Sequence, residues 1–200
     1  MRKKFLSLAL MAVLCLSMVV PAVAASPPSE LEMAAAYVRE HGIMTGDQNG
    51  NLNLDAGLNR AQLTVILTRL SDETGDMGRN AEYYRTVCPF TDVPEWAMPY
   101  AGYCAEKKLM SGYRNRLFGP NDAVIPAACT VMLRVCGIAD GEGSIWSYGT
   151  ACSYAVGLGW IDDAAAHANI ITRGEMAVLI YHAQTGTRPG TAPSTGTGDG

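Results

Sequence analysis

The stretch TGDQNGNLNLD at residues 45–55 places oxygen-bearing side chains at alternate positions, as a calcium-binding loop does. In an EF-hand loop beginning at Asp47, the sixth residue should be glycine and the twelfth a bidentate glutamate. Leu52 and Leu58 occupy these two positions. The Asn-Gly and Gly-Asp steps are instead typical of turns. We therefore expect a turn-rich connection here, with no bound metal and no cofactor.

Cysteine thiols are the next candidates for chemistry, as nucleophiles or metal ligands. Five follow the N-terminal segment: Cys88, Cys104, Cys129, Cys136 and Cys152. Their spacings match no zinc pattern, and those at 104, 129 and 136 fall on apolar helical positions, where a thiol acts as a small hydrophobe. Because the number is odd, at least one thiol stays free unless it pairs between chains. A structural role is predicted, with a disulfide at Cys88 left open.

Histidine side chains offer no catalytic arrangement. His41, His167 and His182 lie far apart in the sequence, and none has an evident partner. The chain contains no G-x-S-x-G, H-E-x-x-H or phosphate-loop motif. His182 lies close to an apolar helical stripe and is expected to be structural. We therefore predict that the protein is not an enzyme.

The N-terminus has the pattern of a secretory signal peptide over residues 1–25. A basic head at residues 2–4 precedes an apolar run at 5–20 and the small-residue segment PAVAA. Cleavage after Ala24 and cleavage after Ala25 both fit. No later apolar stretch is long enough to span a bilayer. The sequence predicts a secreted chain with no membrane contact after cleavage.

Charge and composition narrow the choice of partner. The formal charge is −4, and loss of the basic head brings it to about −7. Such a chain is poorly suited to nucleic acid, and an anionic polymer would have to be recognised through local cations. Residues 187–200 hold almost only Thr, Gly, Pro, Ala and Ser, which predicts a disordered tail.

An amphipathic helical pattern occurs three times in the rest of the chain. RAQLTVILTRL at 60–70 and RGEMAVLIYHA at 173–183 place apolar residues at i, i+3, i+4 and i+7. Residues 129, 132, 133 and 136 repeat the pattern between them. Asn59 with Gln62, and Thr172 with Glu175, predict capping boxes at the first and third of these helices. The middle helix has Pro126 in its first turn and no box.

A shorter amphipathic helix and a glycine break precede each of these helices. The shorter helices begin near residues 31, 97 and 148. Gly46 and Gly112 stand at the same spacing before the second helix of their unit and are expected to be left-handed helix stops. One such unit is too small to fold alone, so three should share a core. The expected units are residues 26–71, 88–138 and 139–186, with a linker at 72–87.

Several motifs in these units are shared with a known family. The first unit contains GIMTG at 42–46, the second FTDVP at 90–94 with Trp96 and FGP at 118–120, and the third ITRGE at 171–175. In this order they resemble the S-layer homology (SLH) repeat, three times over about residues 30–186. The resemblance implies an all-α fold of three helix-loop-helix repeats, arranged with pseudo-threefold symmetry around a shared helical core.

The resemblance also implies a function and a site. SLH triplets hold Gram-positive surface proteins on the cell wall by binding secondary cell-wall polysaccharide, often pyruvylated, or peptidoglycan, in grooves between repeats. Carried over position by position, the ligand-binding residues would be Arg60, Gln62, Asp92, Trp96, Arg173 and Glu175. An arginine fork at a helix N-terminus suits a carboxylate such as a pyruvyl ketal. Other roles stay open: the arginines as brackets between helices, Trp96 in the core, and Asp92 as a cap for a helix near Pro94.

The second unit departs from the family pattern. Pro126 replaces the arginine and Ala128 replaces the acidic or amide residue. A groove that depends on this arginine should therefore be weak or absent. The alternative function is a secreted protein–protein interaction module built on a degenerate SLH core.

Overall fold

The computed structural model describes residues 28–138 and 145–187. These residues are mainly α-helical, and they contain two isolated β-bridges but no strand. The expected all-α class is therefore confirmed. The predicted signal peptide at 1–25 lies outside the described residues, as do residues 188–200 of the predicted tail at 187–200 and residues 139–144 of the expected third unit.

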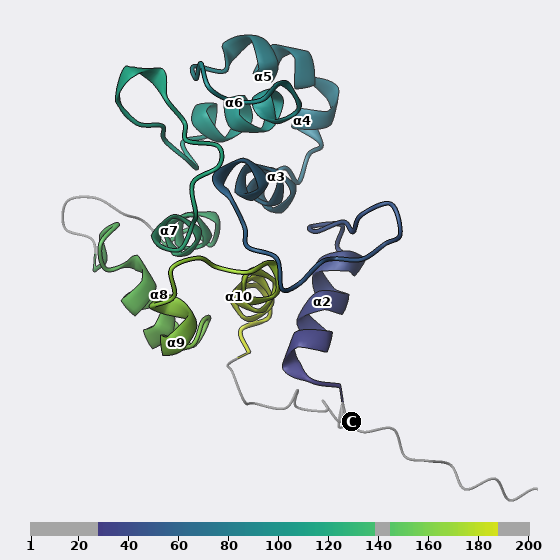
Figure 1. The fold of residues 1–200 in the computed structure, drawn as a ribbon, viewed down its shortest axis with the longest axis vertical. Helices are drawn as coiled ribbons and strands as arrows, with labels where there is room; N and C mark the ends of the chain where they lie inside the picture. Colours follow the sequence, from purple (N-terminus) through teal and green to yellow (C-terminus); the bar gives the residue numbers. More distant parts are fainter. Residues whose placement is uncertain (1–27, 139–144, 188–200) are drawn as a thin grey trace, which may run out of the picture.

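Three of the longer helices form the centre of the molecule, and the other three pack around them. The longer helices are α2 (Glu30–Glu40), α3 (Arg60–Ser71), α6 (Met98–Glu106), α7 (Pro126–Val135), α8 (Ala151–Leu158) and α10 (Arg173–Thr185). Figure 1 shows α3, α7 and α10 nearly end-on in the middle of the view. Two 3₁₀ turns, η1 (Glu95–Ala97) and η2 (Arg114–Arg116), lie before and after α6.

Each of the three outer helices packs on one of the three central helices, and together with the chain connections these contacts form a closed ring. Helix α6 packs on α3, α8 on α7, and α2, which comes first in the chain, on α10, which comes last. Helix α7 also contacts both α3 and α10. The first and last helices are therefore neighbours (Figure 1).

The helix starts agree with the sequence analysis. Asn59 Oδ1 accepts from the Gln62 N–H at 2.9 Å, and Gln62 Oε1 accepts from the Asn59 N–H at 3.2 Å. Thr172 and Glu175 form the same capping box at α10. Helix α7 begins at Pro126 and has no side-chain cap. Both boxes, and the absence of one at α7, are confirmed.

The segment 72–87, expected to be a linker, is largely helical. It forms α4 (Asp76–Arg79) and α5 (Ala81–Val87), and α5 packs along α6. Gly102 allows this packing, because a Cβ there would lie 2.0 Å from the carbonyl oxygen of Tyr84. In the third unit α8 begins at Ala151, so Tyr148 lies before the helix, and a short α9 (Asp163–Ala166) follows.

The prediction that Gly46 and Gly112 are left-handed helix stops is wrong. The left-handed residues after α2 and α6 are Gly42, with φ of 65°, and Lys108, with φ of 58°. Gly46 and Gly112 are needed for space instead. A Cβ on Gly46 would lie 2.3 Å from the backbone of its own loop, and one on Gly112 would lie 2.3 Å from the ring of Phe90.

The core is continuous across the central helices and is closed by the loops. Leu52 and Phe118 stand at the same spacing after Gly46 and Gly112, and both are buried under their loops. His182 is 1% exposed and its Nε2 lies 3.0 Å from Glu30 Oε1, so it joins α10 to α2. In the described part of the chain, no helix is long and apolar enough to cross a membrane.

Candidate functional site

Arg60 and Arg173 begin α3 and α10, and a loop lies across each helix N-terminus. The backbone N–H of Arg60 donates to the Asp122 carbonyl at 3.1 Å, and that of Arg173 to the Ala56 carbonyl at 2.8 Å. The next N–H in each helix also donates to a loop carbonyl. These are the donors that a helix N-terminus would otherwise offer to an anion. The expectation that the helix ends themselves help to bind a carboxylate is therefore wrong.

The Arg60 side chain holds the loop that follows α6. Its Nε donates to the Phe118 carbonyl and its Nη2 to the Ser111 carbonyl, both at 2.8 Å. The guanidinium carbon lies 5.0 Å from the centre of the Tyr113 ring and 4.7 Å from that of Phe118. Arg60 is only 6% exposed. Arg60 therefore links α3 to the loop after α6, which is the bracket role that the sequence analysis left open beside ligand binding.

Arg173 makes the same contacts in the loop that follows α2. Its Nε donates to the Leu52 carbonyl at 2.6 Å and its Nη2 to the Thr45 carbonyl at 3.3 Å. These acceptors align with the two acceptors of Arg60. Arg173 differs in being half-buried, so part of its guanidinium group reaches the surface.

Arg173 also lines a surface hollow of about 130 Å³, called the Trp96 hollow below. Its polar lining consists of Thr45, Gln62, Arg69, Trp96 and Arg173. Three residues predicted from sequence therefore lie together, contributed by α3, η1 and α10. Trp96 is 54% exposed, so it does not have the core role that was left open.

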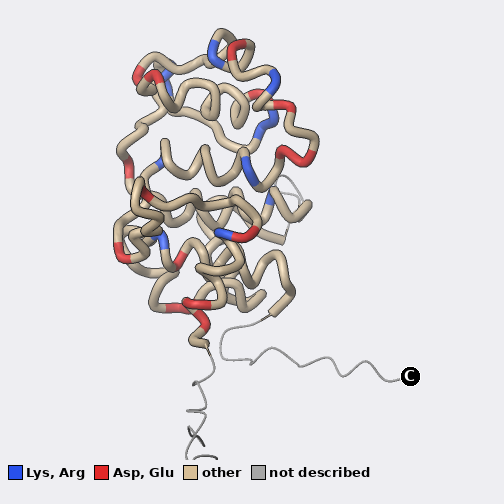
Figure 2. Tube along the Cα trace, turned by 90° about the vertical axis from the view of Figure 1, so that its right-hand side faces the viewer, with Lys and Arg blue, Asp and Glu red and all other residues tan. Residues whose placement is uncertain are grey.

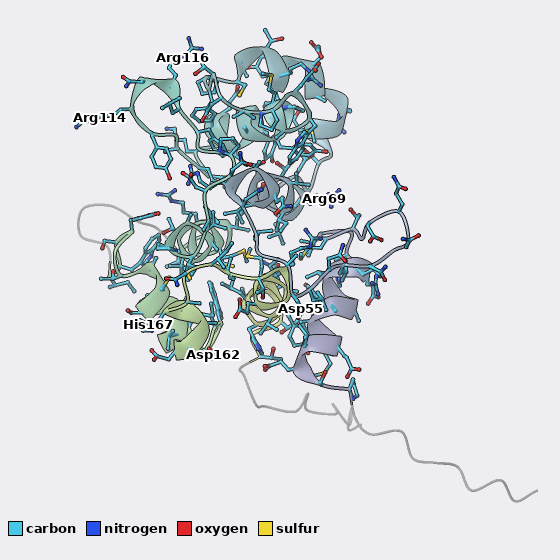
Figure 3. The ribbon with its side chains drawn as sticks, viewed as in Figure 1. Asp55, Arg69, Arg114, Arg116, Asp162 and His167 are labelled. Atoms are coloured by element: carbon cyan, nitrogen blue, oxygen red, sulfur yellow. The ribbon has the colours of Figure 1, made fainter. Side chains whose placement is uncertain are left out.

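Arg69, in the last turn of α3, is the lining residue that sequence reasoning missed. Figure 3 labels Arg69 beside α3. Its Nη1 donates to the Ile43 carbonyl at 3.2 Å and to Thr45 Oγ1 at 3.4 Å. No motif marks this position. The only signal is its place on the same helix as Gln62, two turns along.

The Trp96 hollow carries uncompensated positive charge. No carboxylate lines it, and among the described residues neither Arg69 nor Arg173 forms an ion pair. Burial, followed by the charge of Arg69, lowers the pKa of Arg173 below its usual value. Two cations in one half-enclosed site favour an anionic group from outside the chain.

Arg60 lines a second hollow of about 220 Å³, called the Tyr113 hollow. Tyr113 and Tyr148 are both more than half exposed and form its rim. Arg134 of α7 lies on its wall and donates from Nη1 to a loop carbonyl at 3.1 Å, as Arg69 does in the other hollow. Thr130 lines it too, and its buried hydroxyl has no hydrogen-bond partner within the described residues.

A third hollow, of about 240 Å³, has the opposite charge. Its lining includes Glu30, Asp55, Asp162 and Glu175, and neither lysine nor arginine (Figure 3). Figure 2 shows acidic segments at the end of the molecule where α2 begins. The predicted ligand residue Glu175 therefore lies here, apart from Arg173, and its carboxylate accepts the Thr172 N–H at 2.7 Å. We call this the Glu175 hollow.

Asp92 stabilises a loop and lines none of these three hollows. Its two carboxylate oxygens accept the N–H groups of Phe118 at 2.7 Å and Gly119 at 2.9 Å. Burial alone would raise the pKa of Asp92, but these hydrogen bonds outweigh it and hold the pKa below its usual value. The alternative of a helix cap is wrong, because the turn that starts after Pro94 has no side-chain cap.

The remaining chemistry-bearing residues form no metal or catalytic cluster in the described ranges. No group of three Cys, His, Asp or Glu side chains there could hold a metal. Asp47 Oδ1 accepts the N–H groups of Asn49 and Asn51, so this carboxylate is used within its own turn. All five described cysteines, Cys88 included, are free thiols.

The segment around α6 matches a known protein family. Residues 89–125 match the model of the S-layer homology domain. This S-layer homology segment runs from before η1 to the residue before α7, and it supplies Trp96 to one hollow and Tyr113 to another. S-layer homology domains are non-catalytic binding modules of the cell surface and commonly bind cell-wall polymers. No curated protein matches the chain.

Proposed function

We propose that this protein attaches noncovalently to the Gram-positive cell wall by binding secondary cell-wall polysaccharide. The observation that carries the proposal is the Trp96 hollow, where Arg69 and Arg173 lie without a carboxylate beside an exposed tryptophan. Arginine forks bind carboxylates and phosphates through paired hydrogen bonds. An exposed indole face offers an apolar surface on which a sugar ring can stack.

We further propose that three S-layer homology repeats form the domain. The circuit of helix contacts supports this, because α2, α6 and α8 each pack on the second helix of the neighbouring unit. The matching bonds of Arg60 and Arg173 support it as well, since each arginine holds the loop of the next unit. Pro126, which stands at the third such position, cannot make them. The signal peptide and export from the cell belong to the same proposal.

The charges of the hollows predict which of them contact an anionic polymer. The Trp96 and Tyr113 hollows are lined by arginine and exposed aromatic rings, as acidic carbohydrate requires. The Glu175 hollow would repel the same polymer. Attachment therefore rests on two contacts, and loss of either should reduce avidity sharply.

Sedimentation with cell-wall sacculi tests this function. The chain without residues 1–25 is mixed with intact sacculi, with sacculi stripped of secondary polymer, and with stripped sacculi plus soluble polymer. We expect co-sedimentation with intact sacculi only, and its loss when soluble polymer competes. Equal sedimentation with stripped sacculi would identify peptidoglycan as the ligand. No sedimentation with either preparation would refute wall attachment.

The Glu175 hollow favours a second candidate function, a secreted protein–protein interaction module on the same helical core. The apolar side chains of Leu31, Ile161 and Val178 lie among the carboxylates of this hollow. Such a lining suits a basic, partly apolar protein segment better than an acidic sugar. This candidate predicts no sedimentation with either sacculus preparation.

A further inference from the structure

The interface between α7 and α8 brings two cysteines together. Cys129 lies in the first half of α7 and is completely buried, and Cys152 is the second residue of α8 and is half-buried. The two helices pack directly on each other. Across this interface the Cys129 and Cys152 thiols lie side by side, near enough to interact. Cysteines on two packed helices can be bridged without backbone movement when their Cα atoms lie within about 7 Å.

We propose that Cys129 and Cys152 form an intramolecular disulfide bond once the protein meets an oxidising environment. Disulfides persist in extracytoplasmic proteins, where cells do not keep thiols reduced. Formation during export rests on the proposed function, whereas pairing in the purified chain does not.

The two thiols have different roles in the exchange reaction. The adjacent Cys129 thiol lowers the pKa of Cys152, with a smaller contribution from the charge of His167, and Cys152 is the more accessible of the two. Its thiolate attacks the disulfide of an external oxidant, forming a mixed disulfide and releasing one oxidant thiol. Cys129 then loses its proton and attacks the Cys152 sulfur, which releases the second oxidant thiol. The two cysteines lose two protons and two electrons, and the oxidant disulfide is reduced to two thiols.

The other three cysteines have no second thiol among their interactions with the described residues, so they lack a partner for a disulfide within the chain. Burial raises the pKa of Cys104 to about 12, and its Sγ is directed to the Thr64 carbonyl. Burial also raises the pKa of Cys88 and that of Cys136. The pKa of Cys129 is raised as well, by Cys152 and then by burial, so its place beside Cys152 is what distinguishes Cys129. Of the five cysteines, two would then form the disulfide and three would remain free thiols.

The bond would join two walls of the Tyr113 hollow. Thr130, next to Cys129, lines it from α7, and Tyr148, one turn before Cys152, lines it from the residues preceding α8. A covalent link between these helices would restrict how far Tyr148 can move from α7.

Peptide mapping of the purified chain, residues 26–200, tests the pairing. The protein is incubated with oxidised glutathione, alkylated with iodoacetamide under denaturing conditions without reduction, and digested with trypsin and a glutamate-specific protease. Cleavage at Arg134 and Glu142 puts Cys129, Cys136 and Cys152 on separate peptides. We expect a linked pair of the Cys129 and Cys152 peptides and three alkylated cysteines. Five alkylated cysteines, glutathione adducts alone, or a different linked pair would overturn the proposal.

Single variants separate the bond from a packing effect. In the wild type and in Cys136→Ser, reduction of the oxidised protein should lower Tm by about 5–10 °C. In Cys152→Ser, which changes a half-buried residue, the linked peptide should vanish and reduction should leave Tm unchanged. A Tm that falls equally on reduction of Cys152→Ser would also overturn the proposal. Cys129→Ser is the less informative variant, because a hydroxyl there would be fully buried.

Discussion

Arg60 and Arg173 make the same pair of hydrogen bonds, from Nε and Nη2, to carbonyls at aligned positions of two different loops. They differ in burial, since Arg60 is 6% exposed and Arg173 is half-buried. The arginines that the family pattern marks as ligand-binding thus first hold the loops that shape the hollows. Substituting either one changes the fold and the site together.

The free energy of unfolding should reveal this difference. We expect Arg60→Ala to lower it by about 2–4 kcal/mol, because two charge-assisted hydrogen bonds vanish and the buried Phe118 carbonyl loses its partner. Arg173→Ala should cost about 1–2 kcal/mol, because water can reach its partners. Urea denaturation measures both, with exposed Arg114→Ala as the control. A smaller loss for Arg60→Ala than for Arg173→Ala would contradict the bracket role of Arg60.

Two glycine substitutions test whether Gly112 is needed for space in its loop. Gly112→Ala should destabilise the protein by about 1–3 kcal/mol, because the new Cβ would overlap the Phe90 ring and the Leu117 carbonyl oxygen. Gly78→Ala is the matched control, since it lies in α4 with open space around it, and it should be neutral or stabilising by up to about 1 kcal/mol. Thermal unfolding by circular dichroism distinguishes the two. Equal Tm values would show that Gly112 is not required for space.

Local patterns allowed much of the fold to be predicted. The apolar stripes of α3, α7 and α10 and the capping boxes all depend on residues close in sequence. The helices at 72–87 were missed because α4 is a single turn, and because α5 buries only Tyr84, which packs against Tyr103 of α6. Its stability comes from a partner helix, which no local pattern records.

The candidate site was predictable only in part, for a similar reason. Motifs marked Gln62, Trp96 and Arg173, which meet in one hollow, but Glu175 lies in another and Asp92 in none of the three. Arg69 has no motif, and its importance comes from lying beside Arg173, which is over one hundred residues away in sequence. Arg69 and Arg173 come together only because α10, the last helix, packs beside the first elements of the chain.

Acid titration should isolate the role of Asp92. Its pKa is lower in the folded protein than in the unfolded chain, so its contribution to stability is present above about pH 4 and is lost as pH falls through the folded-state value. Asp92→Asn should therefore lower the free energy of unfolding by about 1–3 kcal/mol at pH 7, and by progressively less as the pH approaches 2. Urea denaturation between pH 2 and pH 7 measures the difference. Asp55→Asn, at an exposed carboxylate, should show little change at either end, and a pH-independent cost for Asp92→Asn would contradict the prediction.

Arg69 provides the most direct test of the Trp96 hollow, because it is exposed and its loss should leave the fold intact. We expect Arg69→Gln to weaken binding to intact sacculi about 10- to 100-fold, the effect of one charge-assisted hydrogen bond to an anionic group. Arg114→Gln makes the same charge change on a side chain that projects from its loop, outside all three hollows, and should bind as the wild type does (Figure 3).

The salt dependence of binding to sacculi distinguishes a local contact at the Trp96 hollow from an effect of the overall charge. Raising NaCl from about 0.1 M to about 1 M shortens the Debye length from about 10 Å to about 3 Å, so wild-type binding should weaken. Binding by Arg69→Gln should depend less on salt, because one of the two cations in the hollow is gone. If Arg69→Gln and Arg114→Gln lose affinity equally, overall charge governs binding and the Trp96 hollow is not the contact. If neither loses affinity, the polymer is bound elsewhere, and the Tyr113 hollow, with Arg134 and its two exposed tyrosines, becomes the site to substitute next.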